Sequence, residues 1–324
     1  MTVKKTIPIS EFKENADIQG FYLCKKKNLR TTRAGELYLD LQLQDKSGEI
    51  GAKVWDRVSE FTKKFNGGDA VAVRGRVESF QDRLQIVIGR INAATEAKYG
   101  RYGFKEELLV PTSSYDAEKM WSGLGKMINN MSNQPLKKLV TDLFRRNKAS
   151  LIKLPASLTL HYPFRSGYLE HILSMAKIGL KLAPHYSADS DLLLAGILLH
   201  GIGKVKELGD ELVPDYTDDG HFVGHTVLGR DMVRESAAGM KDFPSDLLSE
   251  LEHMILCHEG AFESRFRSRP RTKEALLLQL LDNVDAKVAM FDRILSEDSE
   301  EGNWTSRRNY FGTHLRKKPS DSDD

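Results

Sequence analysis

The sequence predicts a multidomain α+β protein, with a small five-stranded β-barrel first and an all-helical domain after it. Two observations predict this fold class. Short segments with period-two apolar alternation occur in residues 1–95, and helical apolar periodicity begins at Asp116. The chain has 324 residues, which is enough for two domains of about 100–200 residues each.

The strand pattern of the first part is typical of an OB-fold, a five-stranded barrel that binds oligonucleotides. Apolar residues alternate in four segments, at 36–45, 48–56, 69–80 and 83–91. The turn sequences "DKSGE", "NGGD" and "QDR" separate them, and the remaining one of the five strands is expected before the segment at 36–45. The stretch "DRVSEFTKKF" is predicted to be a short helix between the segments at 48–56 and 69–80, the third and fourth strands. We therefore expect residues 1–95 to form an OB-fold nucleic-acid-binding domain.

The helical part is expected to follow a polar, irregular linker over residues 96–115. We predict that it spans 116–312 and begins with two amphipathic segments, the second with Pro135 near its start. Helices are predicted at 116–131, 134–147, 167–182, 189–200, 224–237, 245–257 and 272–295. Residues 313–324 are charged and lack apolar periodicity, so we expect no fixed structure there.

Composition excludes some classes of protein. Lys and Arg number 48 and Asp and Glu 46, so net charge argues neither for nor against nucleic acid. Two distant cysteines, Cys24 and Cys257, cannot form a disulfide framework or a cysteine-based zinc site. The N-terminus has no apolar signal core, and no stretch approaches the ~18 apolar residues that a membrane helix needs. These features predict a soluble, cytoplasmic protein without a membrane partner.

Several histidines and one acid lie on or beside apolar helical segments. They are His171, His200, His225, His253, His258 and Asp282. A carboxylate in an apolar helix is costly to bury without a partner, and Mn, Fe, Co, Ni and Zn all accept imidazole and carboxylate ligands. A single such histidine is more often a hydrogen-bonded core residue. The whole set in one domain favours a divalent metal site.

The remaining histidines are predicted to be ordinary surface or supporting residues: His161, His185, His221 and His314. His253 lies five positions before His258, so both cannot share one face of a straight helix. We predict that His258 is the ligand and that His253 supports the site from behind.

Together, His171, "LLHGIGK", "GHTVLG", "LEHMILCHEG" and Asp282 resemble the HD superfamily of metal-dependent phosphohydrolases. With the barrel included, the chain is similar to the YhaM-type 3′→5′ exoribonucleases. The resemblance covers the barrel and the segment from about Leu151 to Leu295. It implies a metal-dependent 3′→5′ exoribonuclease that acts on single-stranded RNA, with single-stranded DNA as an alternative, and it suggests a homo-oligomer.

The resemblance also implies residue roles. One ion would be held by His171, His200 and Asp282, and a second by His225 and His258. His200 and Lys204 are the predicted catalytic residues. Lys204 would contact a substrate phosphate, and the alternative is a solvated lysine beyond a turn.

Two positions depart from the family pattern. The defining pair is His-Asp, whereas this chain has His200-Gly201. A bridging carboxylate neutralises two ions about 3.5–4 Å apart and fixes their spacing, and glycine does neither. We therefore expect one ion rather than two. Glu259 follows His258 where relatives often carry another histidine, and it can bind metal or support the site.

The barrel is predicted to bind the nucleic acid through a basic stretch and one aromatic residue. The candidates are Lys25, Lys26, Lys27, Arg30, Arg33 and Trp55. The stretch "CKKKNLRTTR" is expected in the loop between the first two strands. In the alternative interpretation, the aromatic residues belong to the core and the lysines are solvated.

Two other functions stay open at this point. One is a single-stranded nucleic-acid-binding protein with a degenerate, inactive helical domain, which Gly201 would favour. The other is a hydrolase of small nucleotides, against which the barrel argues, because such an enzyme needs no platform for a nucleic-acid strand.

Overall fold

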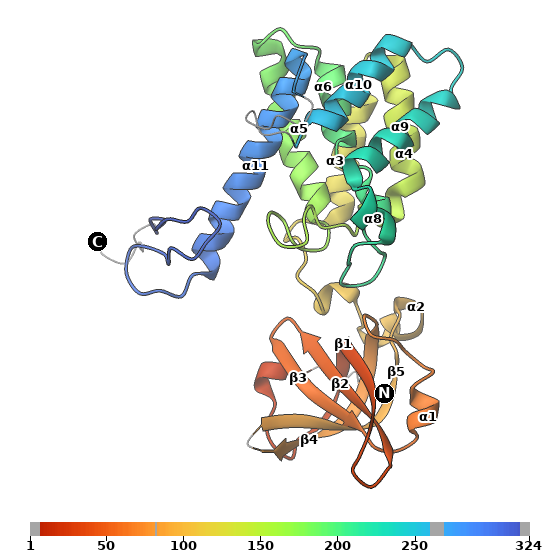
Figure 1. Cartoon of the computed structure of the whole chain (residues 1–324), viewed down its shortest axis with the longest axis vertical. Helices are drawn as coiled ribbons and strands as arrows, with labels where there is room; N and C mark the ends of the chain where they lie inside the picture. Colours follow the sequence, from red (N-terminus) through yellow and green to blue (C-terminus); the bar gives the residue numbers. More distant parts are fainter. Residues whose placement is uncertain (1–6, 82, 260–268, 318–324) are drawn as a thin grey trace. The chain divides into compact units, whose positions relative to one another are not determined.

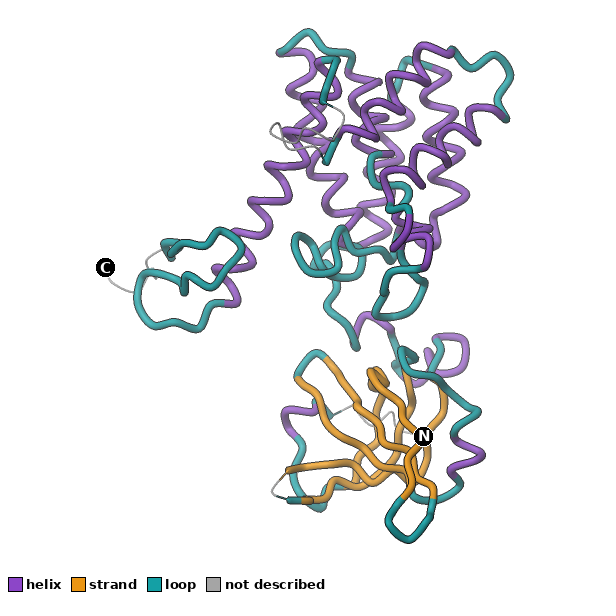
Figure 2. Tube along the Cα trace, viewed as in Figure 1, coloured by secondary structure: helices purple, strands orange, loops and turns teal. Residues whose placement is uncertain are grey.

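The computed structural model describes residues 7–81, 83–259 and 269–317, and the chain divides into two compact units (Figure 1). Unit 1 consists of the chain up to Thr112 together with Asp210–Asp215, and unit 2 consists of Ser113–Gly209 and the residues from Tyr216 onward. Strands are confined to unit 1, and the long helices to unit 2 (Figure 2). No helix among the described residues is long and apolar enough to cross a membrane.

Unit 1 is a closed five-stranded barrel, which confirms the predicted OB-fold. The strands are β1 (Asp17–Thr31), β2 (Leu37–Asp45), β3 (Gly48–Val54), β4 (Ala70–Phe80) and β5 (Arg83–Ala93). Their order around the barrel is β1-β2-β3-β5-β4, with β3 and β5 parallel and the other pairs antiparallel. The short helix α1 (Val58–Phe61) lies between β3 and β4 in sequence, as predicted.

Side-chain alternation explains why these segments form the barrel. In β2, Leu39, Leu41 and Leu43 are buried in the barrel core, and the residues between them are partly exposed. In β4, the register with β5 shifts between Arg74 and Gly75. A Cβ atom at Gly75 would lie 2.4 Å from the carbonyl oxygen of Val87, so this register shift requires glycine.

Two predictions about unit 1 are corrected by the structure. Most of the basic stretch lies within β1 rather than in a loop, because β1 continues to Thr31 and pairs with both β4 and β2. Only Thr32 and Arg33 of the stretch lie in the turn before β2. The expected linker is not an open chain, since it forms α2 (Glu96–Tyr99) and two single 3₁₀ turns. Phe104, Leu109 and Val110 of this segment are buried in a cluster with barrel residues.

Unit 2 contains nine described helices, and the seven long ones lie at the predicted places. They are α3 (Ala117–Asn129), α4 (Gln134–Leu151), α5 (Gly167–His185), α6 (Ser190–Leu199), α7 (Lys204–Glu207), α8 (Asp218–Phe222), α9 (His225–Ala238), α10 (Ser245–Cys257) and α11 (Lys273–Glu297). The two that the sequence did not predict, α7 and α8, have only four and five residues. A helix of four or five residues is too short to show a periodic pattern of apolar residues in the sequence.

The helix α6 forms the centre of unit 2. Asp189 caps its N-terminus by accepting hydrogen bonds from two backbone N–H groups of the first turn. Every residue from Leu192 to Leu199 is buried, and α6 contacts α4, α5, α10 and α11. A helix that is apolar on all sides needs such a surrounding. It ends at Leu199, and the next residue, His200, is the C-cap and is buried in the interior of the unit.

The C-terminal segment differs from the expectation that residues 313–324 lack fixed structure. Leu315 is buried, its N–H group donates to Thr305 Oγ1 at 3.0 Å, and Trp304 pairs with Arg316 in a β-bridge. These contacts hold Leu315 and Arg316 in a defined place, and residues 318–324 lie outside the described part of the chain.

Candidate metal centre

Five imidazole rings form a row inside unit 2. In order they are His161, His171, His200, His258 and His225, and successive ring centroids are 5.0, 5.5, 4.9 and 5.7 Å apart. They come from the loop before α5, from α5, and from the ends of α6, α10 and α9. All but the first are buried. Four predicted ligand histidines are thus brought together, and one unpredicted histidine joins them.

The two rings in the middle of the row are fixed by backbone carbonyl groups. His200 Nδ1 lies 2.8 Å from the carbonyl oxygen of Ile197, and His258 Nδ1 lies 2.6 Å from that of Ile255. A carbonyl oxygen only accepts, so Nδ1 carries the proton in both rings and Nε2 keeps a free lone pair. Burial and the neighbouring His258 lower the pKa of His200 well below its usual range, so this ring is neutral.

Carboxylates fix the other two buried rings in the same sense. His171 Nδ1 donates to Asp285 Oδ2 at 2.8 Å, and Ser174 donates to the other oxygen of Asp285. His225 Nδ1 donates to Glu207 Oε1 at 3.0 Å, and that oxygen also accepts the backbone N–H of His225. Proteins commonly orient metal-binding histidines in this way, with Nδ1 anchored and Nε2 presented.

Glu207 is charged in this environment. Burial raises its pKa, but the hydrogen bonds from His225 and the charge of Lys204 outweigh burial and lower the pKa to about 2. Lys204 Nζ lies 3.5 Å from Glu207 Oε2. The predicted catalytic lysine is therefore next to the end of the row at His225, where it is mostly buried.

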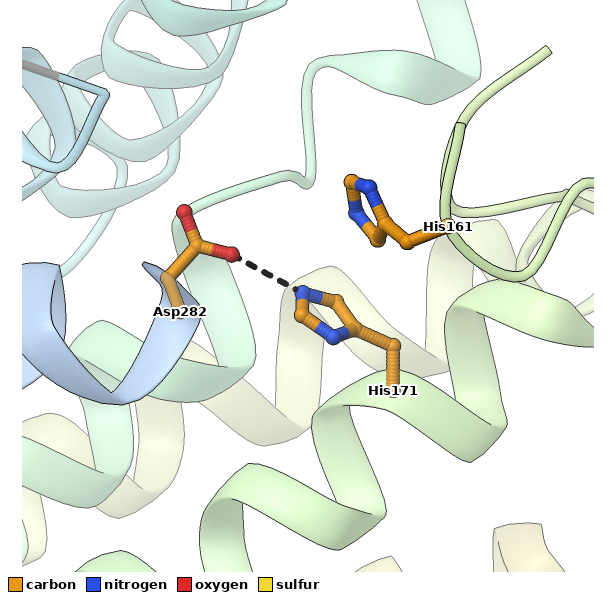
Figure 3. A group of neighbouring side chains, drawn as sticks. All are labelled: His161, His171 and Asp282. Carbon is orange, nitrogen blue, oxygen red and sulfur yellow. Dashed lines mark ion pairs between the residues drawn. The ribbon is translucent and has the colours of Figure 1, made fainter. Parts of the chain in front are cut away.

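The first group of potential ligands consists of His161, His171 and Asp282, whose donor atoms lie within 4.8 Å of one another (Figure 3). Asp282 Oδ1 is 3.2 Å from His171 Nε2, although this contact does not have the geometry of a hydrogen bond. Burial lowers the pKa of His171, but the carboxylates of Asp282 and Asp285 outweigh burial and raise it to about 9. Burial alone would raise the pKa of Asp282, yet the adjacent imidazoles hold it well below its usual range. An ionised carboxylate beside an unsatisfied imidazole nitrogen fits a divalent cation.

His161 reaches this group through a tightly folded loop. A Cβ atom at Gly167 would lie 2.2 Å from the carbonyl oxygen of Tyr162, so only glycine lets the loop approach α5 this closely. Tyr162 itself has a left-handed backbone, with φ of 44°. Burial lowers the pKa of His161 to about 4, which keeps the ring neutral. Sequence reasoning missed His161 because no periodicity marks this loop.

The second group consists of His225, His258 and Glu259, again with donor atoms within 4.8 Å of one another. Glu259 Oε1 lies 3.3 Å from His225 Nε2, and the Glu259 side chain is 42% exposed. The second group thus opens to solvent, whereas His171 of the first group is fully buried. His200 belongs to neither group and lies between them in the row.

The predicted supporting residue His253 lies apart from both groups. Its Nε2 accepts the backbone N–H of Arg271 at 2.9 Å. The other histidines outside the row also have local contacts: His185 packs against Tyr186, His221 against Tyr216, and His314 donates to the carbonyl oxygen of Thr305. These local contacts account for the positions of the four histidine side chains outside the row.

Trp55, the aromatic candidate on the barrel, is open to solvent. Its side chain is 44% exposed and stacks on Tyr38, with ring centroids 4.7 Å apart and an interplanar angle of 27°. Lys53 Nζ lies over the ring of Tyr38, 5.4 Å from its centroid. The stack therefore presents one rigid aromatic platform with a cation beside it.

The basic candidates on the barrel differ in their contacts. Lys27 donates to the carbonyl oxygens of Thr62 and Phe65, so it stabilises the segment after α1. Lys25 pairs with Glu49, and Arg30 pairs with Asp40 at 2.9 Å. Lys26 and Arg33 are exposed.

Comparison with known proteins agrees with this architecture. The sequence model of the HD domain matches residues 168–287, and that of the OB-fold nucleic acid binding domain matches residues 25–93. The fold and the site thus define an HD-type hydrolase domain joined to an OB-fold nucleic-acid-binding domain.

Curated relatives resemble almost the whole chain. The 3′-5′ exoribonuclease YhaM of Bacillus licheniformis is 32% identical over 306 residues, which are 94% of each chain. The enzymes of the same name from Bacillus subtilis and Halalkalibacterium halodurans are 32% and 29% identical, over 94% of this chain in both cases and 94% and 95% of theirs. The chain belongs to the 3′-5′ exoribonuclease YhaM family.

Proposed function

We propose that this protein is a divalent-metal-dependent 3′→5′ exoribonuclease that degrades single-stranded RNA. One observation carries the proposal: four buried imidazoles have Nδ1 anchored, and a carboxylate lies at each end of their row. The relatives' shared activity supports the reaction type. The ligands proposed are His161, His171 and Asp282 at one end and His225, His258 and Glu259 at the other, with His200 between.

The donor set fits Mn, Fe, Co, Ni or Zn, which accept imidazole nitrogen and carboxylate oxygen. When bound, such an ion supplies an activated water and neutralises charge on the phosphoryl oxygens. The protein's own residues position the reactants. Asp285 and Glu207 hold two rings in one tautomer. Lys204, beside Glu207, is proposed to contact a substrate phosphate as a point charge.

The barrel is proposed to hold the RNA strand. Trp55 offers an exposed ring face for one base, and Lys26 and Arg33 offer cations for the phosphates. Lys27 is proposed to be structural, because its ammonium group already serves two backbone carbonyls. Arg30 and Lys25 can reach phosphates only by leaving their carboxylate partners.

Digestion of a 5′-end-labelled RNA in Mn²⁺ tests the proposal. We expect a ladder of shortening labelled fragments, which is abolished by EDTA and by His171→Ala. His185→Ala is the matched control, because His185 is exposed and its ring packs against Tyr186 outside the imidazole row, and it should retain full activity. RNA left intact by the unaltered chain in every divalent metal named above contradicts the proposal.

A second function is favoured by one observation, the glycine at position 201, where the HD pattern has an aspartate. In that case the protein binds single-stranded nucleic acid without cleaving it. Gel-shift titration in EDTA together with the digestion separates the two functions. Binding without cleavage supports the second function, and cleavage that His171→Ala removes supports the first.

A further inference from the structure

The space beside Gly201 is occupied by an aromatic ring. A Cβ atom at this position would lie 2.8 Å from Cε2 of Tyr168, 3.2 Å from its hydroxyl oxygen and 3.3 Å from Cζ. Contacts under 3.0 Å between Cβ and another carbon are not tolerated, so any side chain at position 201 requires Tyr168 to move.

Tyr168 is not free to move. It is fully buried in the core of unit 2, and its hydroxyl donates to the carbonyl oxygen of Leu198 at 3.3 Å. Its ring also packs near His200, at a centroid distance of 6.2 Å. The ring is thus locked between the core and the middle of the imidazole row. Glycine at position 201 and tyrosine at position 168 fit each other as a pair.

The composition of the two ligand groups compensates for the missing carboxylate at position 201. Each has a carboxylate of its own, Asp282 in the first and Glu259 in the second. Neither group needs an oxygen atom supplied from position 201 to balance the charge of an ion. The expectation of a single ion assumed that only a shared carboxylate could hold two.

We propose that Tyr168 excludes a bridging carboxylate from this site, and that the two ligand groups bind divalent ions independently rather than as a bridged pair. This inference rests on the metal ligands named under the proposed function. It adds that Tyr168 is a positioning residue, which determines how the two ions depend on each other.

The stability of three variants tests the packing part without any metal. Gly201→Asp should lower Tm by about 4–8 °C, because it overpacks a buried space. Tyr168→Leu should also lower Tm, because it leaves a cavity. In the double variant the two losses should not add: Gly201→Asp should cost less in the Tyr168→Leu background than in the original chain. Equal costs in the two backgrounds overturn the pairing.

Mn²⁺ titration calorimetry, with metal content measured by mass spectrometry, tests the independence. The unaltered chain should bind two ions. Asp282→Asn should remove one ion and leave the affinity of the other within about twofold, and Glu259→Gln should do the reverse. Tyr168→Phe, which keeps the ring, should behave as the unaltered chain does. In the Tyr168→Leu/Gly201→Asp variant, loss of either carboxylate should weaken both ions.

Three results overturn the proposal: no bound ion, one ion that either single variant abolishes, or mutual weakening in the unaltered background. The proposed function is judged separately, by the RNA ladder. RNA cleavage together with mutual dependence of the ions rejects the independence alone. Independent ions without RNA cleavage reject the exoribonuclease activity alone.

Discussion

Glu207 and Asp285 show how residues outside the ligand groups determine what a histidine can do. Each accepts the Nδ1 proton of one buried ring, so the opposite nitrogen faces the site. The sequence does not reveal this, because Glu207 and His225 are 18 positions apart and Asp285 and His171 are 114 apart. The histidines stand out in the sequence, but their partners require the tertiary structure.

Replacing Glu207 tests this role. Glu207→Gln loses the charge that holds His225, so Mn²⁺ affinity of the group at His225 should fall by about 10–100-fold. The group at His171 should keep its affinity. Asp285→Asn is the matched control at the other end, where the effects should be reversed. Calorimetric titration of both variants measures this, and a Glu207→Gln protein that binds as the unaltered chain does contradicts the role.

Both cysteines are free thiols and are buried. Burial raises the pKa of Cys24 to about 12 and that of Cys257 to about 11. At pH 8 both thiols should therefore react slowly with a thiol reagent in the folded protein and rapidly in denaturant. The free energy of unfolding should fall as pH rises above about 8.5, because the unfolded thiols then ionise while the folded ones keep their protons. Two fast-reacting native thiols would rule this out.

At the scale of elements, the periodicity of apolar residues correctly predicts the barrel strands and the seven long helices. The strands and long helices follow from alternation and from helical spacing, and their ends agree with caps such as Asp189 of α6. What failed was local: the length of β1, the packed segment after β5 and the loop that carries His161. In each case, contacts with distant residues decide the conformation, and a single sequence contains no sign of them.

The register shift between β4 and β5 at Gly75 gives a prediction at this scale. Gly75→Ala should lower the free energy of unfolding by about 1–3 kcal/mol, because its Cβ would meet the backbone of Val87, which cannot yield as a flexible side chain does. Gly51→Ala on β3 is the matched control, since a Cβ there meets nothing within 4 Å. Urea denaturation of both variants measures the difference. Equal stabilities would mean that this position tolerates a side chain.

At the scale of the whole molecule, two units divide the proposed work. The barrel has its own core and an exposed aromatic stack, and the helical unit has the imidazole row. The sequence shows this division well, because the histidines are confined to one half and period-two alternation to the other. It does not show that Asp210–Asp215 groups with the barrel, since such a grouping arises only in the fold.

Trp55 tests the division. Trp55→Ala should weaken the binding of single-stranded RNA by about 1–3 kcal/mol. It should leave hydrolysis of a small phosphodiester such as bis(p-nitrophenyl) phosphate unchanged. Trp304→Ala is the matched control, because Trp304 is 52% exposed in the helical unit and should change neither. Binding by fluorescence anisotropy and hydrolysis by absorbance measure the two effects. A Trp55→Ala protein with unchanged RNA affinity would exclude this ring as a platform.

The burial of α6 on every side has a consequence for how this chain can evolve. Any residue of Leu192–Leu199 that changes volume pushes on neighbouring helices and shifts the end of α6. His200 is the next residue, so a substitution in this apolar segment displaces the imidazole in the middle of the row. Selection for the position of His200 therefore also constrains Leu192–Leu199, although no residue of that segment has a polar side chain.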